Sequence, residues 1–174
     1  MLRGEKVGLR ARIEPDVAVL QRELHDDALT FARASIRPWL PVSPGRPGAP
    51  FTVSDPDPGR TQFSIVSLAG EELLGECGLY GIDTHNRSAE IGIALLPGAR
   101  GAGYALDAVR VLCDYCFAMR GLHRVQIETL ADNDAMRATA VRAGFTEEGV
   151  RREAAWVNGG FVDSVVYGRL NGVP

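Results

Sequence analysis

The sequence predicts a mixed α/β fold, an α+β arrangement in which helices cover a mixed sheet, and three observations support it. Strand-like runs separated by turn residues follow one another between residues 62 and 95, which is typical of an antiparallel meander. An amphipathic helix at 103–120 leads into a buried run at 125–130, so a parallel pair with a crossover helix is expected. Asn158-Gly159-Gly160 indicates a final hairpin.

The N-terminal part predicts one strand and two helices. Residues 7–11 alternate between apolar and polar side chains, as a strand does. Glu14-Pro15-Asp16 is typical of a helix start, because proline suits the first turn and acids suit its positive end. Apolar residues continue at helical spacing to Leu24, and a second short helix is expected from 26 to about 35.

The segment at about 36–60 is expected to be irregular, because it holds seven of the ten prolines. Two interpretations stay open for it. It is either a surface connector or a flap on the substrate side, since long loops without regular structure often carry function.

The remaining elements follow in an order that completes the fold. Strands are expected at 62–68, 73–80 and 89–95, then the helix 103–120, the strand 125–130, a helix 134–143 that Gly144 ends, and strands 145–157 and 161–170. The resulting order is β-α-α-βββ-α-β-α-ββ. Neither an internal repeat nor a linker divides it, so residues 1–174 are expected to form one domain.

Composition excludes several classes of function. With 19 basic and 22 acidic residues the chain has a formal charge of -3, whereas general nucleic-acid binders have a basic excess. No apolar run reaches the roughly 20 residues that cross a bilayer, and residues 1–12 lack the apolar core of a signal peptide, so a cytoplasmic protein without membrane contact is expected. Three cysteines do not indicate a disulfide framework.

The glycine-rich stretch 96–105 joins a strand to the N-terminus of the best helix. Small residues let a ligand approach the backbone, and the free amides at a helix start form an anion site. Arg100 adds a positive charge. The stretch therefore predicts a phosphate or pyrophosphate site.

Other interpretations of this stretch are weaker. A nucleotide-binding Walker loop would continue with Lys and Ser/Thr after Gly103, but Tyr104 and Ala105 stand there. A dinucleotide fingerprint would need a third glycine where Leu106 stands, and it would follow the first strand. A glycine-rich turn without any ligand stays as an alternative.

Arg100-Gly101-Ala102-Gly103-Tyr104-Ala105 resembles the Arg/Gln-x-x-Gly-x-Gly/Ala loop by which the GNAT acetyltransferase superfamily binds acyl-coenzyme A. The surroundings strengthen the resemblance, which runs from about 7 to 170 and is closest to the RimJ/RimL branch of ribosomal-protein N-terminal acetyltransferases. The matching residues are Ala89-Glu90-Ile91-Gly92, Asn133, Ala143-Gly144-Phe145, Glu148-Gly149, Asn158-Gly159 and Asp163.

The resemblance implies an N-acetyltransferase that moves an acetyl group from acetyl-CoA to a primary amine in a ternary complex, without a metal. The acceptor would be a protein N-terminal α-amine or a small molecule. Pantetheine would run between splayed strand ends, with the thioester carbonyl facing a backbone amide near Leu95. The implied cofactor-binding residues are Ile93, Leu95, Arg100, Gly101, Ala102, Gly103, Tyr104, Ala105 and Asn133. The fold often pairs into homodimers through edge strands and terminal hairpins.

Glu90 is the candidate catalytic base, because it lies on the strand beside the expected thioester and an amine must lose a proton to attack. It could instead be a polar residue on an exposed strand face, paired with a neighbour such as Arg87. Glu128 and His85 are weaker candidates. Asn133 could instead cap a helix with Asp132.

The sequence departs from the family where the thiolate leaves. Many relatives place a tyrosine where Ala140 stands, and the RimJ/RimL branch often places a serine where Met136 stands. Neither residue can donate a proton, so the general acid is unassigned. A non-catalytic acyl-CoA-binding sensor or partner module is therefore the alternative function.

Cys113 and Cys116 have the Cys-x-x-Cys spacing of some zinc and redox sites. No histidine pair supplies the other zinc ligands, and the two cysteines lie in mid-helix rather than at a helix N-terminus. Core packing is the favoured interpretation.

Overall fold

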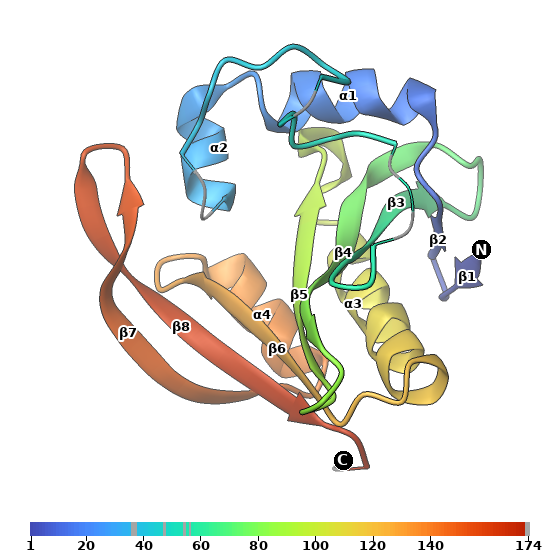
Figure 1. The fold of residues 1–174 in the computed structure, drawn as a ribbon, viewed down its shortest axis with the longest axis vertical. Coiled ribbons are helices and arrows are strands. Elements are labelled where there is room, and N and C mark those ends of the chain that lie inside the picture. Colours follow the sequence, from blue (N-terminus) through green and yellow to red (C-terminus); the bar gives the residue numbers. More distant parts are fainter. Residues whose placement is uncertain (36–37, 47, 54, 56, 173–174) are drawn as a thin grey trace.

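The computed structural model describes residues 1–35, 38–46, 48–53, 55 and 57–172, in which eight strands form one twisted mixed sheet (Figure 1). The sheet order is β1-β2-β3-β4-β5-β6-β8-β7. The strands are β1 (Leu2–Arg3), β2 (Val7–Arg10), β3 (Thr61–Ser67), β4 (Leu73–Asp83), β5 (Ser88–Leu95), β6 (Arg124–Leu130), β7 (Thr146–Val157) and β8 (Gly160–Leu170). The predicted mixed α/β fold is thus confirmed.

The pairing of β5 with β6 is the parallel contact of the sheet, whereas the other neighbouring strands pair antiparallel. This parallel pairing was predicted from the crossover helix. It holds for three residue pairs, which run from Ser88 with Arg124 to Glu90 with Gln126. Beyond Glu90 the two strands separate, and the sheet opens at its centre.

The helices α1 (Glu14–Leu24), α2 (Ala28–Ala34), α3 (Tyr104–Asp114) and α4 (Asp134–Arg142) occupy both faces of the sheet (Figure 1). Packing of α3 and α4 buries the main core, which includes Leu79, Ile91, Leu112 and Tyr167. On the opposite face, α1 packs through Val17, Leu20 and Leu24 over the ends of β4 and β5. Polar side chains of the central strands face this second side.

Three details differ from the sequence prediction. β1 was missed, because a strand of two residues has no periodicity to detect. The helix expected at 103–120 is α-helical only to Asp114 and continues as a π-helical turn, Tyr115–Met119. A short 3₁₀ turn, Pro97–Ala99, precedes it inside the stretch that was expected to be a simple loop.

The proline-rich segment lies against α1 in its described part, and positions 36–37, 47, 54 and 56 lie outside the described residues. Phe51 is buried among the apolar side chains of α1. The Trp39 indole N–H donates to the carbonyl of His25 at 2.8 Å, and Gln21 donates to the carbonyl of Val42. The segment is thus anchored onto the helix that covers the second face of the sheet.

No helix within the described ranges is both long and apolar enough to cross a membrane. Across the same ranges, the His, Cys, Asp and Glu side chains form no group of three or more that could hold a metal ion.

Candidate active site

The loop between β5 and α3 presents unpaired backbone amides. Gly101 and Gly103 have φ angles of 80° and 82°, a left-handed conformation that favours glycine, and Gly103 is the N-cap of α3. Within the described part of the chain, the amides of residues 101–106 have no hydrogen-bond acceptor. Six such groups at a helix start, with the helix dipole behind them, make a cradle for an anion.

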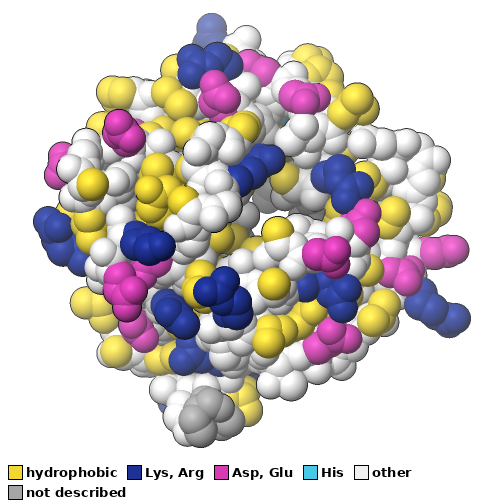
Figure 2. All heavy atoms as spheres, turned by 180° about the vertical axis from the view of Figure 1, so that it is seen from behind, with side chains coloured by type: hydrophobic (Ala, Val, Ile, Leu, Met, Phe, Trp, Pro, Cys, Tyr) yellow, Lys and Arg dark blue, Asp and Glu magenta, His cyan; other side chains and the backbone are white. Residues whose placement is uncertain are grey.

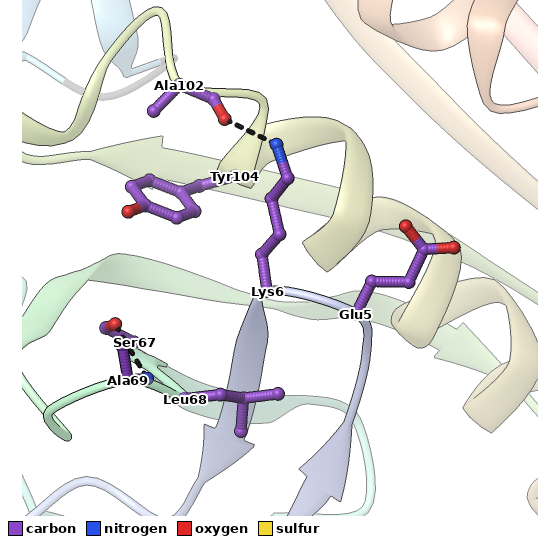
Figure 3. A pocket seen from close by; sticks show the side chains of 7 residues that line it. All are labelled: Glu5, Lys6, Ser67, Leu68, Ala69, Ala102 and Tyr104. Carbon is purple, nitrogen blue, oxygen red and sulfur yellow. Dashed lines mark hydrogen bonds between the residues drawn. The ribbon is translucent and has the colours of Figure 1, made fainter.

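Two cations border this loop. The Arg100 side chain is exposed, and its Nε donates to the carbonyl of Leu95 at 3.3 Å. The Lys6 ammonium donates to the carbonyl of Ala102 at 3.0 Å. Figure 3 shows Lys6 and Tyr104 side by side in a pocket that Glu5, Ser67, Leu68, Ala69 and Ala102 complete. Sequence reasoning missed Lys6, although it is the only lysine of the chain.

The open edge of β5 leads from this loop to the centre of the sheet. The amide of Leu96 donates to the carbonyl of Leu74 on β4, so by strand alternation Ile93 and Leu95 turn their amides and carbonyls toward β6. β6 pairs with β8 along this stretch but no longer with β5. The backbone groups of Ile93 and the amide of Leu95 are therefore available to an extended ligand, whereas the carbonyl of Leu95 already accepts from Arg100.

Glu90 lies on the face of β5 opposite α3, at the inner end of this open edge. Its strand neighbours are Tyr80 on β4 and Gln126 on β6. Tyr80 lies over Gly92, where a Cβ atom would come within 2.8 Å of the ring. This contact leaves no room for a side chain at Gly92, so the Tyr80 ring covers the backbone two residues from Glu90.

The pKa of Glu90 is raised above its ordinary value. Burial is the main cause, and the nearby Glu128 carboxylate adds to it, whereas Gln126 and Arg151 oppose the shift. The ion pair with Arg87 that was considered is not among the ion pairs of the described residues. A half-buried carboxylate with a raised pKa is suited to accept a proton near neutral pH.

Glu128 and His85, the two weaker candidates for the catalytic base, lie in less suitable positions than Glu90. Both oxygens of Glu128 accept from Arg151, at 2.9 and 2.7 Å, and Ser164 donates to it at 2.5 Å. Both of its oxygens are thus engaged by Arg151, and one of them also by Ser164. His85 lies in the turn before β5, at the opposite end of the strand from Leu95, and the backbone amide of His85 donates to Asp83.

Glu76 is a further carboxylate on this face that sequence reasoning missed. Glu76 pairs across the strands with Ala94, which is next to Leu95. Glu90 is five residues from Leu95, or about 16 Å of extended strand, so Glu76 lies nearer to the expected thioester. Glu76 forms an ion pair with Arg12, whose side chain is buried and lies over the Phe51 ring. Burial raises the pKa of Glu76, and Arg12 opposes the rise. The sequence signal that could have identified Glu76 is an acidic residue inside an otherwise apolar strand.

Asn133 caps α4, as the structural interpretation predicted, since its Oδ1 accepts from the amide of Met136 at 3.2 Å. Its Nδ2 donates to the hydroxyl of Thr129 at 3.0 Å, which leaves one N–H of the side chain for a ligand. Met136 is partly buried against the main core and Ala140 is fully buried. A cofactor contact of Asn133 stays a prediction.

The cysteines are core residues, as predicted. Cys113 and Cys116 are free thiols with 0% exposure. Burial raises the pKa of Cys113 to about 11 and that of Cys116 to about 12, so neither is a reactive thiolate near neutral pH.

The molecule is hollowed near its centre when seen from behind, with hydrophobic, basic and acidic side chains around the opening (Figure 2). Residues 92–95 on the open edge of β5 are themselves partly exposed.

Comparison with known proteins gives one family match. The model of the acetyltransferase (GNAT) domain family matches residues 7–146. This range includes the glycine-rich stretch 96–105, the open edge of β5, Glu90 and Asn133.

Relatives and solved structures agree with that match. The chain is 39% identical over 98 residues to the putative ribosomal N-acetyltransferase YdaF of Bacillus subtilis, covering 56% of this chain and 54% of the relative. It is 30% identical over 100 residues to the ribosomal-protein-serine acetyltransferase of Escherichia coli, covering 58% and 56%. The chain therefore spans little more than half the length of these relatives.

The crystal structure of spermidine N-acetyltransferase from Vibrio cholerae, in complex with CoA and spermine, superimposes with a TM-score of 0.77. The alignment covers 95% of each chain at 20% identity, so it shows a shared fold.

Proposed function

The chain belongs to the GNAT acetyltransferase family, and on this premise we propose that it transfers an acetyl group from acetyl-CoA to a primary amine. The observation that carries the proposal is the row of six unpaired amides at residues 101–106, continuous with the open edge of β5. Pyrophosphate would accept from the amides of Gly101 to Ala105 and from Arg100. Pantetheine would pair with Ile93 and Leu95 in the gap between β5 and β6.

The transfer proceeds by direct attack within a ternary complex. The amine nitrogen bonds to the thioester carbon, the carbon–sulfur bond breaks, and coenzyme A leaves as a thiolate. An amide near Leu95 stabilises the charge that develops on the carbonyl oxygen. The amine's proton would pass to Glu90 along a chain of several waters, because about 16 Å of strand separates Glu90 from Leu95 and a single water does not span that distance.

The departing thiolate needs no strong acid. Thiols are much stronger acids than alcohols, as the cysteine side chain with its pKa of about 8.5 illustrates, so a thiolate can leave without being protonated first. The apolar Met136 and the buried Ala140 are therefore compatible with turnover. Asn133 would contact pantetheine or an ordered water with its remaining N–H.

The acceptor is a protein N-terminal α-amine or a small polyamine-like amine. Relatives named for ribosomal proteins favour the first, and the fold match to a spermidine acetyltransferase favours the second. The described part of the proline-rich segment, packed on α1, would border the acceptor side. We further propose a cytoplasmic location. We also propose a homodimer that forms through the β7–β8 hairpin, because β7 is an exposed edge strand.

Thiol release with a panel of amines tests the proposal. We expect acetyl-CoA to bind by calorimetry and thiol to appear with at least one amine, either an N-terminal peptide or a polyamine, together with a product heavier by one acetyl group. Binding without thiol release from any amine would instead support the acyl-CoA-binding module, which the absence of a tyrosine or serine at 140 and 136 favours. Absence of binding would contradict both functions.

A further inference from the structure

Lys6 is held beside the phosphate loop by a buried acid. Asp107, in the first turn of α3, is 9% exposed and accepts hydrogen bonds from the amides of Glu5, Lys6 and Val7 at 3.1, 2.7 and 2.9 Å. Because three backbone amides donate to this one carboxylate, the segment is fixed against the start of α3. The Lys6 side chain therefore begins from a fixed point next to the loop.

The ammonium of Lys6 is a cation without an acidic partner among the described residues. Its contact is the carbonyl of Ala102, and a Cβ atom on Gly103 would lie 3.2 Å from Nζ. In Figure 3 the Lys6 chain extends toward Ala102, whereas Glu5 of the same pocket points along α3. An ammonium has three donors, so two of them stay free for a ligand.

We propose that Lys6 is a direct ligand of the coenzyme A pyrophosphate, acting from outside the glycine-rich loop. This inference rests on the proposed function. The phosphates would lie on the amides of 101–106, and Lys6 reaches the same loop from the segment before β2. A cation next to unpaired amides strengthens binding of a doubly charged group.

The loop amides and Lys6 have different tasks in this arrangement. The amides fix the orientation of the phosphates through hydrogen bonds of defined direction. Lys6 adds a charge on a flexible stem, and it can bridge the carbonyl of Ala102 and a phosphate oxygen. Because Asp107 anchors the segment, the backbone of Lys6 has a fixed position relative to the loop.

Affinity measurements with three ligands test the proposal. We expect Lys6→Met to weaken coenzyme A and dephospho-coenzyme A alike, by about fivefold to twentyfold, and to leave pantetheine binding unchanged. Lys6→Arg should restore most of the affinity, and raising the salt concentration should shrink the difference. Arg3→Met is the matched control, because Arg3 is an exposed cation of the same segment.

Chemical labelling gives a second readout that a purely structural lysine would not change. An amine-reactive ester can modify only Lys6 and the α-amino group of the polypeptide, since the chain has no other lysine. We expect coenzyme A to protect Lys6 from the ester and to leave labelling of the α-amino group unchanged, as read by mass spectrometry.

Each contrary outcome has a distinct meaning. If wild type binds coenzyme A while Lys6→Met binds it equally well and labelling is unprotected, the inference is wrong and the proposed function stands. A loss for coenzyme A but not for dephospho-coenzyme A would overturn the assignment to pyrophosphate. If wild type does not bind coenzyme A, the proposed function itself fails.

Discussion

At the scale of single residues, Glu90→Gln separates catalysis from binding. The glutamine keeps the size and hydrogen-bonding reach of Glu90 but cannot take the proton of an ammonium. We expect turnover at pH 7 to fall by about 10²–10⁴-fold, with coenzyme A affinity nearly unchanged. The loss should shrink as pH rises toward the pKa of the amine, where the free amine needs no base.

Glu76→Gln is the comparison for this experiment. Glu76 lies on the same sheet face and nearer to the expected thioester. If the Glu90 variant turns over like wild type while a folded Glu76 variant does not, the assignment of the base to Glu90 is refuted. Loss of cofactor affinity in Glu90→Gln would instead indicate a structural role on the strand.

The raised pKa of Glu90 predicts the acid limb of the pH profile. Only the carboxylate accepts a proton, so kcat/KM should fall as pH decreases through a pKa above that of a free glutamate. Replacing Glu128 by Gln removes a neighbouring negative charge and should move this limb to lower pH. Measurements with one amine across the pH range check the direction, and a limb that stays in place would exclude Glu90 as the titrating group.

Residue positions were predictable from the sequence only where a motif or a period marked them. The glycine-rich loop stood out as a strand-to-helix turn, and Glu90 was chosen as a candidate because the family resemblance places its strand beside the thioester; the roles of both stay predictions. Lys6 and Glu76 were not found, since their neighbours Ala102 and Arg12 are far from them in sequence. Contacts of this range depend on the sheet order, which the local pattern does not specify.

At the scale of elements, the turn into α3 depends on Gly103. Any side chain there is strained at φ 82°, at a cost of about 1–2 kcal/mol, and would also approach Lys6. We expect Gly103→Val to abolish coenzyme A binding as measured by calorimetry. Gly98→Ala is the matched control, because nothing lies within 4 Å of its Cβ position and its φ is not left-handed. Normal binding by the valine variant would exclude the loop as the phosphate site.

The two cysteines belong to the packing of α3 and its π-helical turn. Replacing Cys113 and Cys116 together by alanine should leave turnover near wild type, because both thiols are buried away from the loop. Small cavities should lower the free energy of unfolding by about 2 kcal/mol in chemical denaturation. Stoichiometric zinc in the purified protein, or a folded variant without activity, would contradict this.

Element boundaries were predicted well where the chemistry was local. Gly144 ends α4 as expected, and the final hairpin turns at the predicted glycines. The change from α-helix to a π-helical turn after Asp114 was not predicted. The apolar residues of the sequence keep ordinary α-helical spacing through Cys116 and Phe117. Tertiary packing, rather than sequence pattern, decides such a turn.

At the scale of the whole molecule, coenzyme A should stabilise the fold. A ligand at 100 times its Kd adds about 2.7 kcal/mol, which corresponds to a rise in Tm of about 5–10 °C for a chain of this size. Thermal denaturation with coenzyme A and with pantetheine alone checks this, and the nucleotide-containing ligand should give the larger shift at equal concentration. Equal or absent shifts would contradict a site built around the phosphates.

The separation of β5 from β6 after three residue pairs has a consequence for inhibition. Ile93 and Leu95 leave a vacant strand position at the centre of a sheet. Pantetheine carries two amide groups, and it would occupy this position much as a short peptide strand does. A compact strand mimetic without any phosphate could therefore compete with the acetyl donor, and its selectivity would come from the side chains that face the gap.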